Sequence, residues 1–381
     1  MNNSDRLILD ISRLIHRAWS RKRFTGIDRV GIAYLENFQS CAYCLIRIGK
    51  FWRILDKKEN KTLLNFIKKG ELDKWKFISF LFYHWVVFGS VLNLSDTLIH
   101  TSHSGLNNIS FRNKIRKIGL DALYFLHDLI PIHFSEYCVD GEKEKHRERL
   151  FTMCHTSKLV LLNSKKTQAD FLKYVELQSW PVPKCVVAKI GHSKLTKLRT
   201  SKLFNQPYFV IVGTIEPRKN HLLLLHIWRD LVLSKDDLCP HLFIIGQRGW
   251  ESEQVNDMLD RCTLIKSHVH EISDCNDEQL ASWIAFAQAL LFPSFVEGFG
   301  IPLLEALELG TPVIASNLSV FEEIAGNTPD YFHPLDAVSW KKAINEYSDH
   351  NSSMRKAQIQ RMADFDPPTW DNHFYVVEAT L

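Results

Sequence analysis

The chain of 381 residues is long enough for two or three domains at the usual size of roughly 100–200 residues each. Its apolar content of 45% and charged content of 24% are ordinary for a globular protein. A net charge of +4 is too small over this length to indicate nucleic-acid binding, so no nucleic-acid partner is expected.

Apolar runs typical of strands alternate with helical stretches through the first half of the chain. The runs are residues 7–12, 41–48, 97–102, 122–128, 158–164 and 185–191. Ser164 is well placed to cap the helix KKTQADFLKYV that follows the fifth run. This alternation predicts a parallel sheet with helices on both faces.

One apolar segment of the first half, residues 77–94, needs separate treatment. Its eighteen residues carry no formal charge, which reaches the lower limit for crossing a bilayer. It contains four polar residues, however, and no second such segment accompanies it, so a buried helix or helix–strand pair is predicted. Monotopic membrane contact is the alternative. Residues 44–76 before it hold ten Lys or Arg against four Asp or Glu, which predicts a solvated face or a dock for anionic lipid headgroups or a phosphate-bearing acceptor.

A polar and basic stretch, residues 192–206, is interpreted as an interdomain linker. Strand-like runs then resume at residues 208–213, 241–246, 269–273, 289–294 and 311–316. The helix predicted over NDEQLASWIAFAQ has the acidic start that suits a helix N-terminus. A proline pair precedes a last predicted helix in the tail PPTWDNHFYVVEATL. The chain is therefore expected to form two α/β halves and a C-terminal helix.

Two carboxylates, Glu297 and Glu305, lie eight residues apart in the run FPSFVEGFGIPLLEALELGTPVIAS. Pro302 suits the first turn of a helix, so the run predicts a strand, a glycine loop and a helix with Glu305 on its first turn. The loop amides and the helix dipole favour an anion such as a diphosphate. The carboxylates would accept hydrogen bonds from hydroxyl groups on either side of it, as in a nucleotide sugar. The alternative is two solvated glutamates, but ligands bind at strand ends in open parallel sheets, which favours the functional interpretation.

The run from Glu297 to Glu305 resembles the Glu-x7-Glu signature of retaining glycosyltransferases of family 4. Residues 310–326 and 209–220 extend the resemblance, and residues 124–131 and 25–30 match more loosely. The first half is similar to bacterial transferases that build O-antigen or capsule chains, including mannosyltransferases.

The resemblance implies the GT-B fold, in which two Rossmann-like, doubly wound parallel-sheet domains face a cleft. It implies an N-terminal acceptor-side domain over residues 1–200 and a C-terminal nucleotide-sugar-binding domain over residues 201–365. The helix in residues 366–381 would cross back to the first domain, the alternative being an extra helix on the second one.

The resemblance also assigns roles within the signature. Glu297 would contact hydroxyl groups of the donor sugar, and Glu305 would contact the ribose hydroxyls. The phosphate would be met by backbone amides, and two glycines would let the backbone approach closely. The amides are those of Phe299, Gly300, Ile301 and Leu303, and the glycines are Gly298 and Gly300.

The run GTIEPRKN supplies two cations after a predicted strand that ends at Gly213. Arg218 and Lys219 before a helix suit a diphosphate, because they neutralise the leaving group as the glycosidic bond breaks. The alternative for both is a solvated loop. Many relatives carry a phosphate-binding arginine where this chain has Thr214, which leaves the diphosphate to Arg218 and Lys219.

Five further residues complete the predicted site. His127 would line the cleft beside donor sugar and acceptor, or be a structural histidine at a strand end. Asp128 would bind acceptor or only orient its neighbours. Gly26, in a predicted loop, would let the backbone approach the diphosphate, and Arg29 would bind acceptor or pair with an acidic side chain. Trp250 would stack on a base or simply pack.

The resemblance implies a retaining, metal-independent hexosyltransferase that needs no cofactor and acts by front-face substitution. The expected partners are a nucleotide-sugar donor, best guessed as GDP-mannose, and a lipid-linked or oligosaccharide acceptor of surface polysaccharide synthesis. No Asp-x-Asp motif ends a predicted strand, which agrees with metal independence. A cytoplasmic protein, or a peripheral one on the inner face of the membrane, is expected. The alternatives are a sugar-nucleotide hydrolase or epimerase of the same fold, or a non-catalytic binding scaffold.

Overall fold

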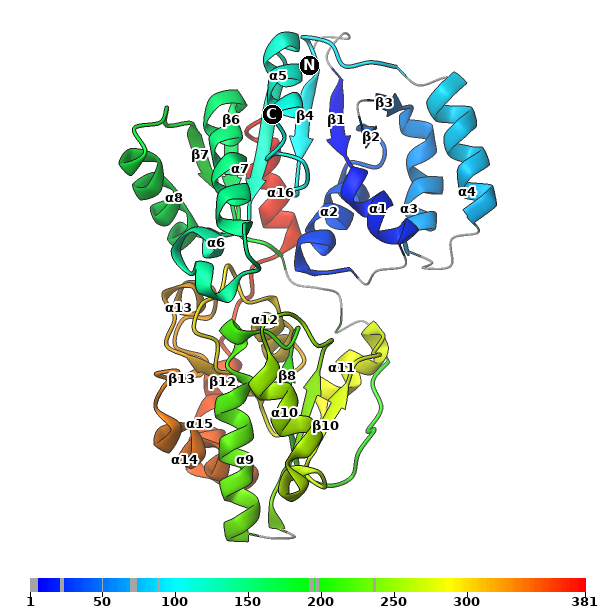
Figure 1. Ribbon diagram of the computed structural model, residues 1–381. Coiled ribbons are helices and arrows are strands. Elements are labelled where there is room, and N and C mark those ends of the chain that lie inside the picture. Colours follow the sequence, from blue (N-terminus) through cyan, green and yellow to red (C-terminus); the bar gives the residue numbers. More distant parts are fainter. Residues whose placement is uncertain are drawn as a thin grey trace. The chain divides into compact units, whose positions relative to one another are not determined.

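The computed structural model describes residues 6–20, 24–49, 51–68, 74–87, 90–191, 195, 199–235 and 238–381 (Figure 1). The chain divides into two compact units. Unit 1 holds residues 1–132, 143–190 and 370–381, and unit 2 holds residues 133–142 and 191–369. The units change at residue 190 rather than at the expected residue 200, and residues 133–142 join unit 2.

Unit 1 is built on a sheet of seven strands in the order β3-β2-β1-β4-β5-β6-β7. All six runs predicted as strands are strands, and their neighbours pair in parallel. The exception is β3, an edge strand that was not predicted and that pairs antiparallel with β2 through a tight hairpin. The strands are β1 (Leu7–Asp10), β2 (Tyr43–Ile48), β3 (Phe51–Leu55), β4 (Thr97–His100), β5 (Asp121–Leu126), β6 (Leu159–Leu162) and β7 (Lys184–Val187).

Helices connect these strands. Ser164 caps α8 as predicted, because its side chain accepts a hydrogen bond from the Thr167 amide. The helices of this part of the chain are α1 (Ser12–Trp19), α2 (Gly26–Asn37), η1 (Lys57–Glu59), α3 (Asn60–Lys68), α4 (Lys74–Leu81), η2 (Phe82–Val87), α5 (Ile109–Ile118), α6 (Ile130–His133), η3 (Ser135–Tyr137), α7 (Glu142–Thr156) and α8 (Lys165–Leu177).

The apolar segment 77–94 begins as a helix, as predicted, but its burial is only partial. Phe77 of α4 is fully buried against Phe66 of α3. Phe82 and Tyr83, in the π-helical η2, are 65% and 54% exposed. Residues 88 and 89, and the side chains of 85–89, lie outside the described part. No described helix is long and apolar enough to cross a membrane.

Unit 2 is built on a six-stranded sheet in the order β10-β9-β8-β11-β12-β13, in which every neighbouring pair is parallel. The chain moves outward from β8 to β10, returns to β11 and then moves the other way. Right-handed crossovers therefore place α9 and α10 on one face and α12 and α13 on the other. The strands are β8 (Tyr208–Val212), β9 (His241–Ile245), β10 (Val269–Ile272), β11 (Leu290–Phe292), β12 (Val313–Ser316) and β13 (Asp330–Phe332), the last of which was not predicted.

The helices of unit 2 bury a core around two fully buried tryptophans, Trp228 and Trp340. The predicted acidic helix start is present in α11, where Asn276 and Gln279 form a capping box. The helices are η5 (Pro217–Lys219), α9 (His221–Lys235), α10 (Glu253–Arg261), η7 (Thr263–Ile265), α11 (Asp277–Ala285), α12 (Ile301–Glu308), α13 (Ser319–Ala325), α14 (Ala337–Ser348) and α15 (Ser353–Met362).

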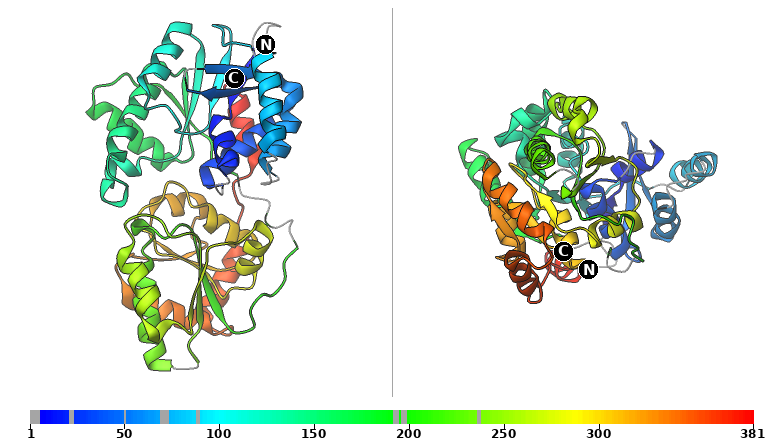
Figure 2. Two further views of the ribbon diagram at one scale, coloured as in Figure 1. Left: turned by 45° about the vertical axis from the view of Figure 1, so that its right-hand side comes forward. Right: turned by 90° about the horizontal axis from the view of Figure 1, so that it is seen from below.

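The last helix, α16 (Trp370–Glu378), belongs to unit 1 and lies among its elements (Figure 2). His373 of this helix donates from Nδ1 to the Lys189 carbonyl and accepts from the Tyr34 hydroxyl, both at 2.9 Å. Burial lowers the pKa of His373 to about 4, which keeps the ring neutral for this pair of bonds. The Phe374 ring meets Tyr34 of α2 and Phe38, the C-cap residue of that helix, edge-on.

Candidate functional site

The candidate site lies where the strand order of the unit 2 sheet reverses. β8 has β9 on one side and β11 on the other, so the loops after β8 and β11 leave the same carboxyl edge next to each other. Ligands of open parallel sheets bind at this kind of switch point. The loop after β8 carries Arg218 and Lys219, and the loop after β11 carries Glu297. Sequence stretches that were singled out separately therefore meet here.

Hydrogen bonds to backbone carbonyl groups hold the two loops together. The Phe295 amide donates to the Arg218 carbonyl at 2.8 Å, and Arg218 Nη1 donates to the Val296 carbonyl at 3.2 Å. Asn220 ends η5 in a left-handed conformation with φ 57°, and its side chain donates to the Pro293 carbonyl at 3.2 Å. The charged side chains of both loops thus start from a fixed backbone.

Glu297 is the centre of a buried charged cluster. Its Oε1 lies 2.5 Å from Lys219 Nζ and its Oε2 lies 2.7 Å from Arg218 Nη1. The Ser294 hydroxyl also donates to Oε1, at 2.8 Å. Only 8% of the Glu297 side chain is exposed. Burial alone would raise the pKa of Glu297, but the two cations and the hydrogen bonds outweigh it and lower the pKa to about 2, so the carboxylate is ionised.

Glu216 is a member of the cluster that the sequence analysis missed. This buried carboxylate lies 2.5 Å from Arg218 Nη2. Burial raises the pKa of Glu216, with Arg218 and Lys219 opposing the rise. Burial likewise lowers the pKa of Lys219, against the pull of Glu297. The signal was present, because Glu216 lies between the strand end and the two cations in GTIEPRKN. The cluster therefore balances two cations against two carboxylates.

Close packing beneath the cluster explains three glycines. A Cβ on Gly246 would lie 1.9 Å from the Gly213 carbonyl oxygen, which no side chain allows. Gly213 itself has φ +141°, and a Cβ there would press on Lys219 Cε at 3.3 Å. Thr214, the next residue, packs so near Gly249 that a Cβ on that glycine would lie 2.7 Å from Thr214 Cγ2. These contacts seat the Lys219 stem at the strand end.

The glycine loop leads into α12 through Gly300, the N-cap residue, whose φ of +115° favours glycine. Ile301 is the first helical residue, and Phe299 before it is buried. Gly298 lies between Phe299 and Glu297. The Leu303 amide, which was predicted to contact phosphate, already donates to the Gly300 carbonyl at 3.0 Å.

Glu305 is buried, with 2% exposure, but it lies on the second turn of α12. The prediction of the first turn was wrong, since the helix begins at Ile301 and an α-helical turn takes 3.6 residues. Glu308 follows one turn later. Burial and the nearby Glu305 charge raise the pKa of Glu308 to about 7. Nothing in the sequence pattern singled out Glu308.

Trp250 follows the Gly246 loop and is 39% exposed. Its indole N–H donates to the Tyr137 carbonyl at 3.0 Å. The Tyr137 ring in turn stacks on Phe295, with centroids 5.8 Å apart and planes 13° apart. Trp250 thus packs on the segment that supports the loop before Glu297. This contact with Tyr137 was not anticipated from the sequence.

The remaining predicted residues belong to unit 1. His127 follows β5 and is buried, and its Nε2 donates to the Thr101 carbonyl at 2.7 Å. Burial lowers the pKa of His127 to about 4. This hydrogen bond fixes the His127 ring, and its place beside donor sugar and acceptor stays a prediction. Asp128 accepts from the Ile130 amide at 3.0 Å and so orders the turn that follows it.

Gly26 is the first residue of α2 and not a loop residue, which corrects the prediction. Thr25 is the N-cap, and the Asp28 carboxylate accepts from the Thr25 amide at 2.8 Å to complete a capping box. Asp28 is fully buried and also pairs with Arg13 at 2.7 Å. Arg29 lies one residue further along the helix and is half-buried.

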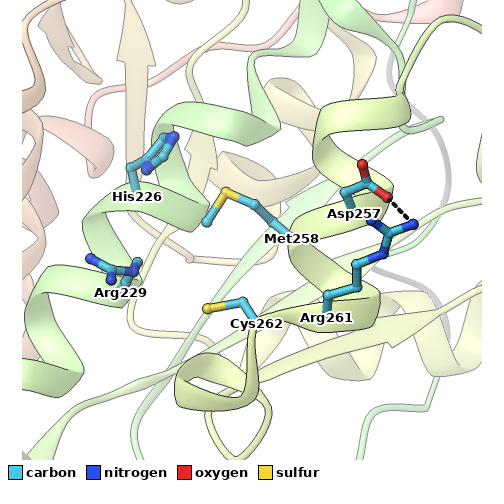
Figure 3. A pocket seen from close by; sticks show the side chains of 6 residues that line it. All are labelled: His226, Arg229, Asp257, Met258, Arg261 and Cys262. Carbon is cyan, nitrogen blue, oxygen red and sulfur yellow. Dashed lines mark ion pairs between the residues drawn. The ribbon is translucent and has the colours of Figure 1, made fainter.

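A hollow of about 430 Å³ lies elsewhere on unit 2, between α9 and α10 (Figure 3). Its lining includes a pair of cationic side chains, of which Arg261 is bound to Asp257 at 3.2 Å. None of the predicted site residues lines it. The hollow is lined by His226, Arg229, Asp257, Met258, Arg261 and Cys262.

Comparison with known proteins gives matches that agree with this geometry. Residues 196–363 match the family model of glycosyl transferases group 1. The chain is 26% identical over 263 residues to the serotype-specific mannosyltransferase WbdA of Escherichia coli, covering 65% of this chain but 32% of that protein. It is 27% identical to the O-antigen chain mannosyltransferase B of Escherichia coli, covering 66% of this chain and 67% of that one. The chain thus spans about a third of the length of WbdA.

Solved structures show the same fold. Anabaena Alr3699/HepE in complex with UDP-glucose superposes with a TM-score of 0.66 at 16% identity, covering 99% of each chain. A trehalose-6-phosphate synthase superposes with a TM-score of 0.65 at 11% identity, covering 98% of each chain. Both neighbours are GT-B glycosyltransferases. Residues 196–363 thus match the model of glycosyl transferases group 1, and the two parallel-sheet α/β units of the chain have the GT-B fold.

Proposed function

We propose that the protein is a retaining glycosyltransferase that moves a hexose from a nucleotide sugar to a growing, lipid-linked surface polysaccharide of the O-antigen or capsule type. The observation that carries this proposal is the buried cluster of Arg218, Lys219 and Glu297 at the switch point of the unit 2 sheet. A group 1 glycosyltransferase domain contains all three residues.

In this proposal Arg218 and Lys219 bind the diphosphate. Charge develops on the diphosphate as the glycosidic bond breaks, and two buried cations held in place by their loops stabilise that charge. Glu297, which lies between the cations and the start of α12, accepts hydrogen bonds from the donor sugar. Glu305, buried on α12, accepts hydrogen bonds from the ribose hydroxyls.

The best donor candidate is GDP-mannose. Relatives named as mannosyltransferases support mannose, among them the O-antigen chain mannosyltransferase RfbU of Salmonella typhimurium, 34% identical over 140 residues that cover 36% of this chain and 37% of that one. The structural neighbour HepE was solved with UDP and with UDP-glucose, so UDP-hexoses are the natural competitors in any assay.

The proposed reaction retains the configuration of the sugar without a metal. The acceptor hydroxyl attacks from the face that the diphosphate leaves, and the departing phosphate takes the proton of that hydroxyl as the new bond forms. Arg218 and Lys219 supply the positive charge for which other enzymes use a divalent ion. Glu297 is bound to both cations in the structure, which suits a binding role better than nucleophilic attack.

The proposed acceptor side includes an anionic membrane surface, because a lipid-linked acceptor is met there. Unit 1 offers exposed lysines, among them Lys57, Lys58 and Lys61, together with exposed apolar side chains. Trp75 on α4 is 79% exposed, and Phe82, seven residues on, is 65% exposed. Basic and aromatic side chains together are the composition that binds at a membrane interface.

A transfer assay tests the proposal. The purified chain is incubated with radiolabelled GDP-mannose, UDP-glucose or UDP-galactose and a polyprenyl-diphosphate-linked oligosaccharide. We expect label in the lipid-linked product, with an α-anomeric linkage by NMR. Free sugar released equally with and without acceptor would instead indicate the hydrolase alternative, and conversion of the unattached donor would indicate the epimerase. Binding without turnover of any donor would leave only the scaffold.

A further inference from the structure

The two nitrogens at the end of Arg218 have different partners. Nη2 lies 2.5 Å from Glu216, while Nη1 lies 2.7 Å from Glu297 and donates to the Val296 carbonyl. Lys219 Nζ lies 2.5 Å from Glu297. Glu297 therefore contacts one nitrogen of each cation, and Glu216 contacts the other terminal nitrogen of Arg218.

These contacts bear directly on the binding of a diphosphate. Phosphate oxygens seek the same charge-assisted hydrogen bonds from arginine and lysine that a carboxylate accepts. The cluster is already neutral, with two cations and two carboxylates, so a diphosphate placed beside an unmoved Glu297 would add negative charge that no cation of the cluster compensates. In a buried site, where charges are weakly screened, this repulsion is strong.

We propose that Glu297 and the diphosphate of the donor compete for Arg218 Nη1 and Lys219 Nζ, and that Glu216 is a positioning residue that keeps Arg218 in place during the exchange. This inference rests on the proposed function, since it concerns how that site takes its donor. The diphosphate displaces the carboxylate from the cations, and the displaced carboxylate becomes available to the hydroxyl groups of the donor sugar. Binding of the diphosphate to the two cations would thereby make Glu297 available to bind the donor sugar.

The structure distinguishes the carboxylate that exchanges from the one that stays. Glu216 is 4% exposed, and its own carbonyl accepts from the Lys219 amide at 3.0 Å, so side chain and backbone fix it to the cation loop. Glu297 comes from the other loop, and two glycines follow it within three residues. Its contacts to the cations are made by the side chain, which can turn without moving the loop after β8.

Calorimetry with GDP and UDP tests the exchange without requiring transfer. Glu297→Gln keeps the shape of the side chain but removes the competing charge, so we expect the nucleoside diphosphate to bind roughly tenfold more tightly than to the wild type. Glu297→Asp, whose shorter side chain cannot reach both cations, should give an intermediate gain and covers the case in which the glutamine variant does not fold. Glu271→Gln is the matched control, because Glu271 pairs with Arg248 outside the cluster and its loss should leave the affinity unchanged.

Two variants test the positioning role of Glu216. Glu216→Ala removes the partner of Nη2, so Arg218 turns toward Glu297 and the nucleoside diphosphate should bind at least threefold more weakly, with a matching rise in the donor KM. Glu216→Gln retains an acceptor for Nη2 and should restore affinity to the wild-type value or better. A merely structural role would predict equal losses in both variants, accompanied by equal falls in Tm.

The outcomes separate this inference from the proposed function. If wild-type protein binds GDP or UDP and Glu297→Gln and Glu297→Asp bind it no more tightly, the exchange is wrong and the proposed function stands. Equal affinity in Glu216→Ala and wild type would remove the positioning role. If wild-type protein binds no nucleoside diphosphate at all, the proposed function fails first.

Discussion

Lys219 Nζ lies 2.5 Å from Glu297 Oε1, which makes one buried ion pair of two residues that are 78 positions apart. The pair joins the loop after β8 to the loop after β11, and these strands are neighbours at the switch point of the sheet. Lys219 also lies over the Phe292 ring, with Nζ 4.7 Å from the ring centroid, so the ammonium group is held from two sides. The contact with the Phe292 ring does not involve Glu297, so it would keep the ammonium group in place while the carboxylate and a diphosphate exchange.

Replacing Lys219 by alanine should impair both the binding of the donor and the transfer step. We expect weaker binding of the nucleoside diphosphate and a lower kcat, because the charge contact of one oxyanion-stabilising group is worth about 2–4 kcal/mol in the transition state. Calorimetry with GDP and steady-state transfer kinetics measure the two effects. Lys341→Ala is the matched control, because that lysine pairs with Asp230 on the helices of the same unit. Unchanged kinetics in Lys219→Ala would remove the residue from the site.

The sequence predicted which residues lie at the carboxyl edge of the unit 2 sheet, but it did not predict which of their side chains contact one another. Gly300, Lys219 and Glu297 were all singled out, because strand ends followed by glycines or charges are legible along the chain. The contact between Lys219 and Glu297 depends on β8 and β11 being neighbours, and strand order is a property of the whole sheet. For the same reason Glu216 passed unnoticed, since in the sequence it is one more polar residue of a loop.

Errors of position have simple local causes. Glu305 was placed on the first helical turn because Pro302 suggested the start, whereas the helix begins only one residue earlier and a turn is too short to include Glu305. Gly26 was expected in a loop, but Thr25 and Asp28 cap a helix directly at that glycine. The edge strand β3 was missed because its five residues include an arginine and lie in the basic stretch.

Substitution of Glu305 by glutamine should weaken the binding of free nucleoside diphosphate and of intact donor alike, because both ligands carry the ribose. A hydrogen bond to a charged group is worth about 1.5–3 kcal/mol, so each Kd should rise by roughly tenfold or more. Glu308→Gln, on the next turn of the same helix, is the control and should change neither. Since Glu305 is buried, a Tm within a few degrees of wild type is required before the affinities are compared. A loss confined to the intact donor would move Glu305 to the sugar end.

Transfer should survive removal of divalent metal. The reason is that Arg218 and Lys219 would supply the positive charge that a divalent metal ion otherwise supplies to the diphosphate. The measurement is turnover after dialysis against EDTA, with and without added Mg²⁺ or Mn²⁺. We expect equal rates. Turnover that disappears with EDTA and returns with either metal would contradict metal independence, while leaving the fold untouched.

Glu308 should make the protein less stable as the pH rises through neutrality. Its pKa in the folded protein is about 7, above its ordinary value of 4.5, so the folded state holds a proton that the unfolded state has already released. Stability from this group is complete below pH 4.5 and falls as the pH rises to about 7. Because the side chain is only partly buried, the loss is about 1 kcal/mol rather than the full linkage value. Urea unfolding of wild type and Glu308→Gln between pH 5 and 8 measures it, and parallel pH profiles would refute the assignment.

Binding to an anionic membrane should have an electrostatic and an apolar part that can be separated. Each lysine close to an anionic surface contributes roughly 1 kcal/mol, so Lys57, Lys58 and Lys61 together give measurable binding. This part should fade as salt shortens the Debye length from about 10 Å at 0.1 M to about 3 Å at 1 M. The triple change to glutamine should remove most of the salt-sensitive binding to vesicles that contain phosphatidylglycerol.

The apolar part rests on Trp75 and Phe82, which are 79% and 65% exposed. Trp75→Ser with Phe82→Ser should reduce the binding that remains at high salt, because burial of two aromatic side chains in the interface does not depend on ionic strength. Leu238, 85% exposed in unit 2, gives the matched control Leu238→Ser. Sedimentation with vesicles over a series of salt concentrations measures the salt-sensitive and the salt-resistant binding in one experiment. Binding that resists salt and both sets of changes would place the contact elsewhere, and absence of binding to any vesicle would leave these side chains as ordinary surface.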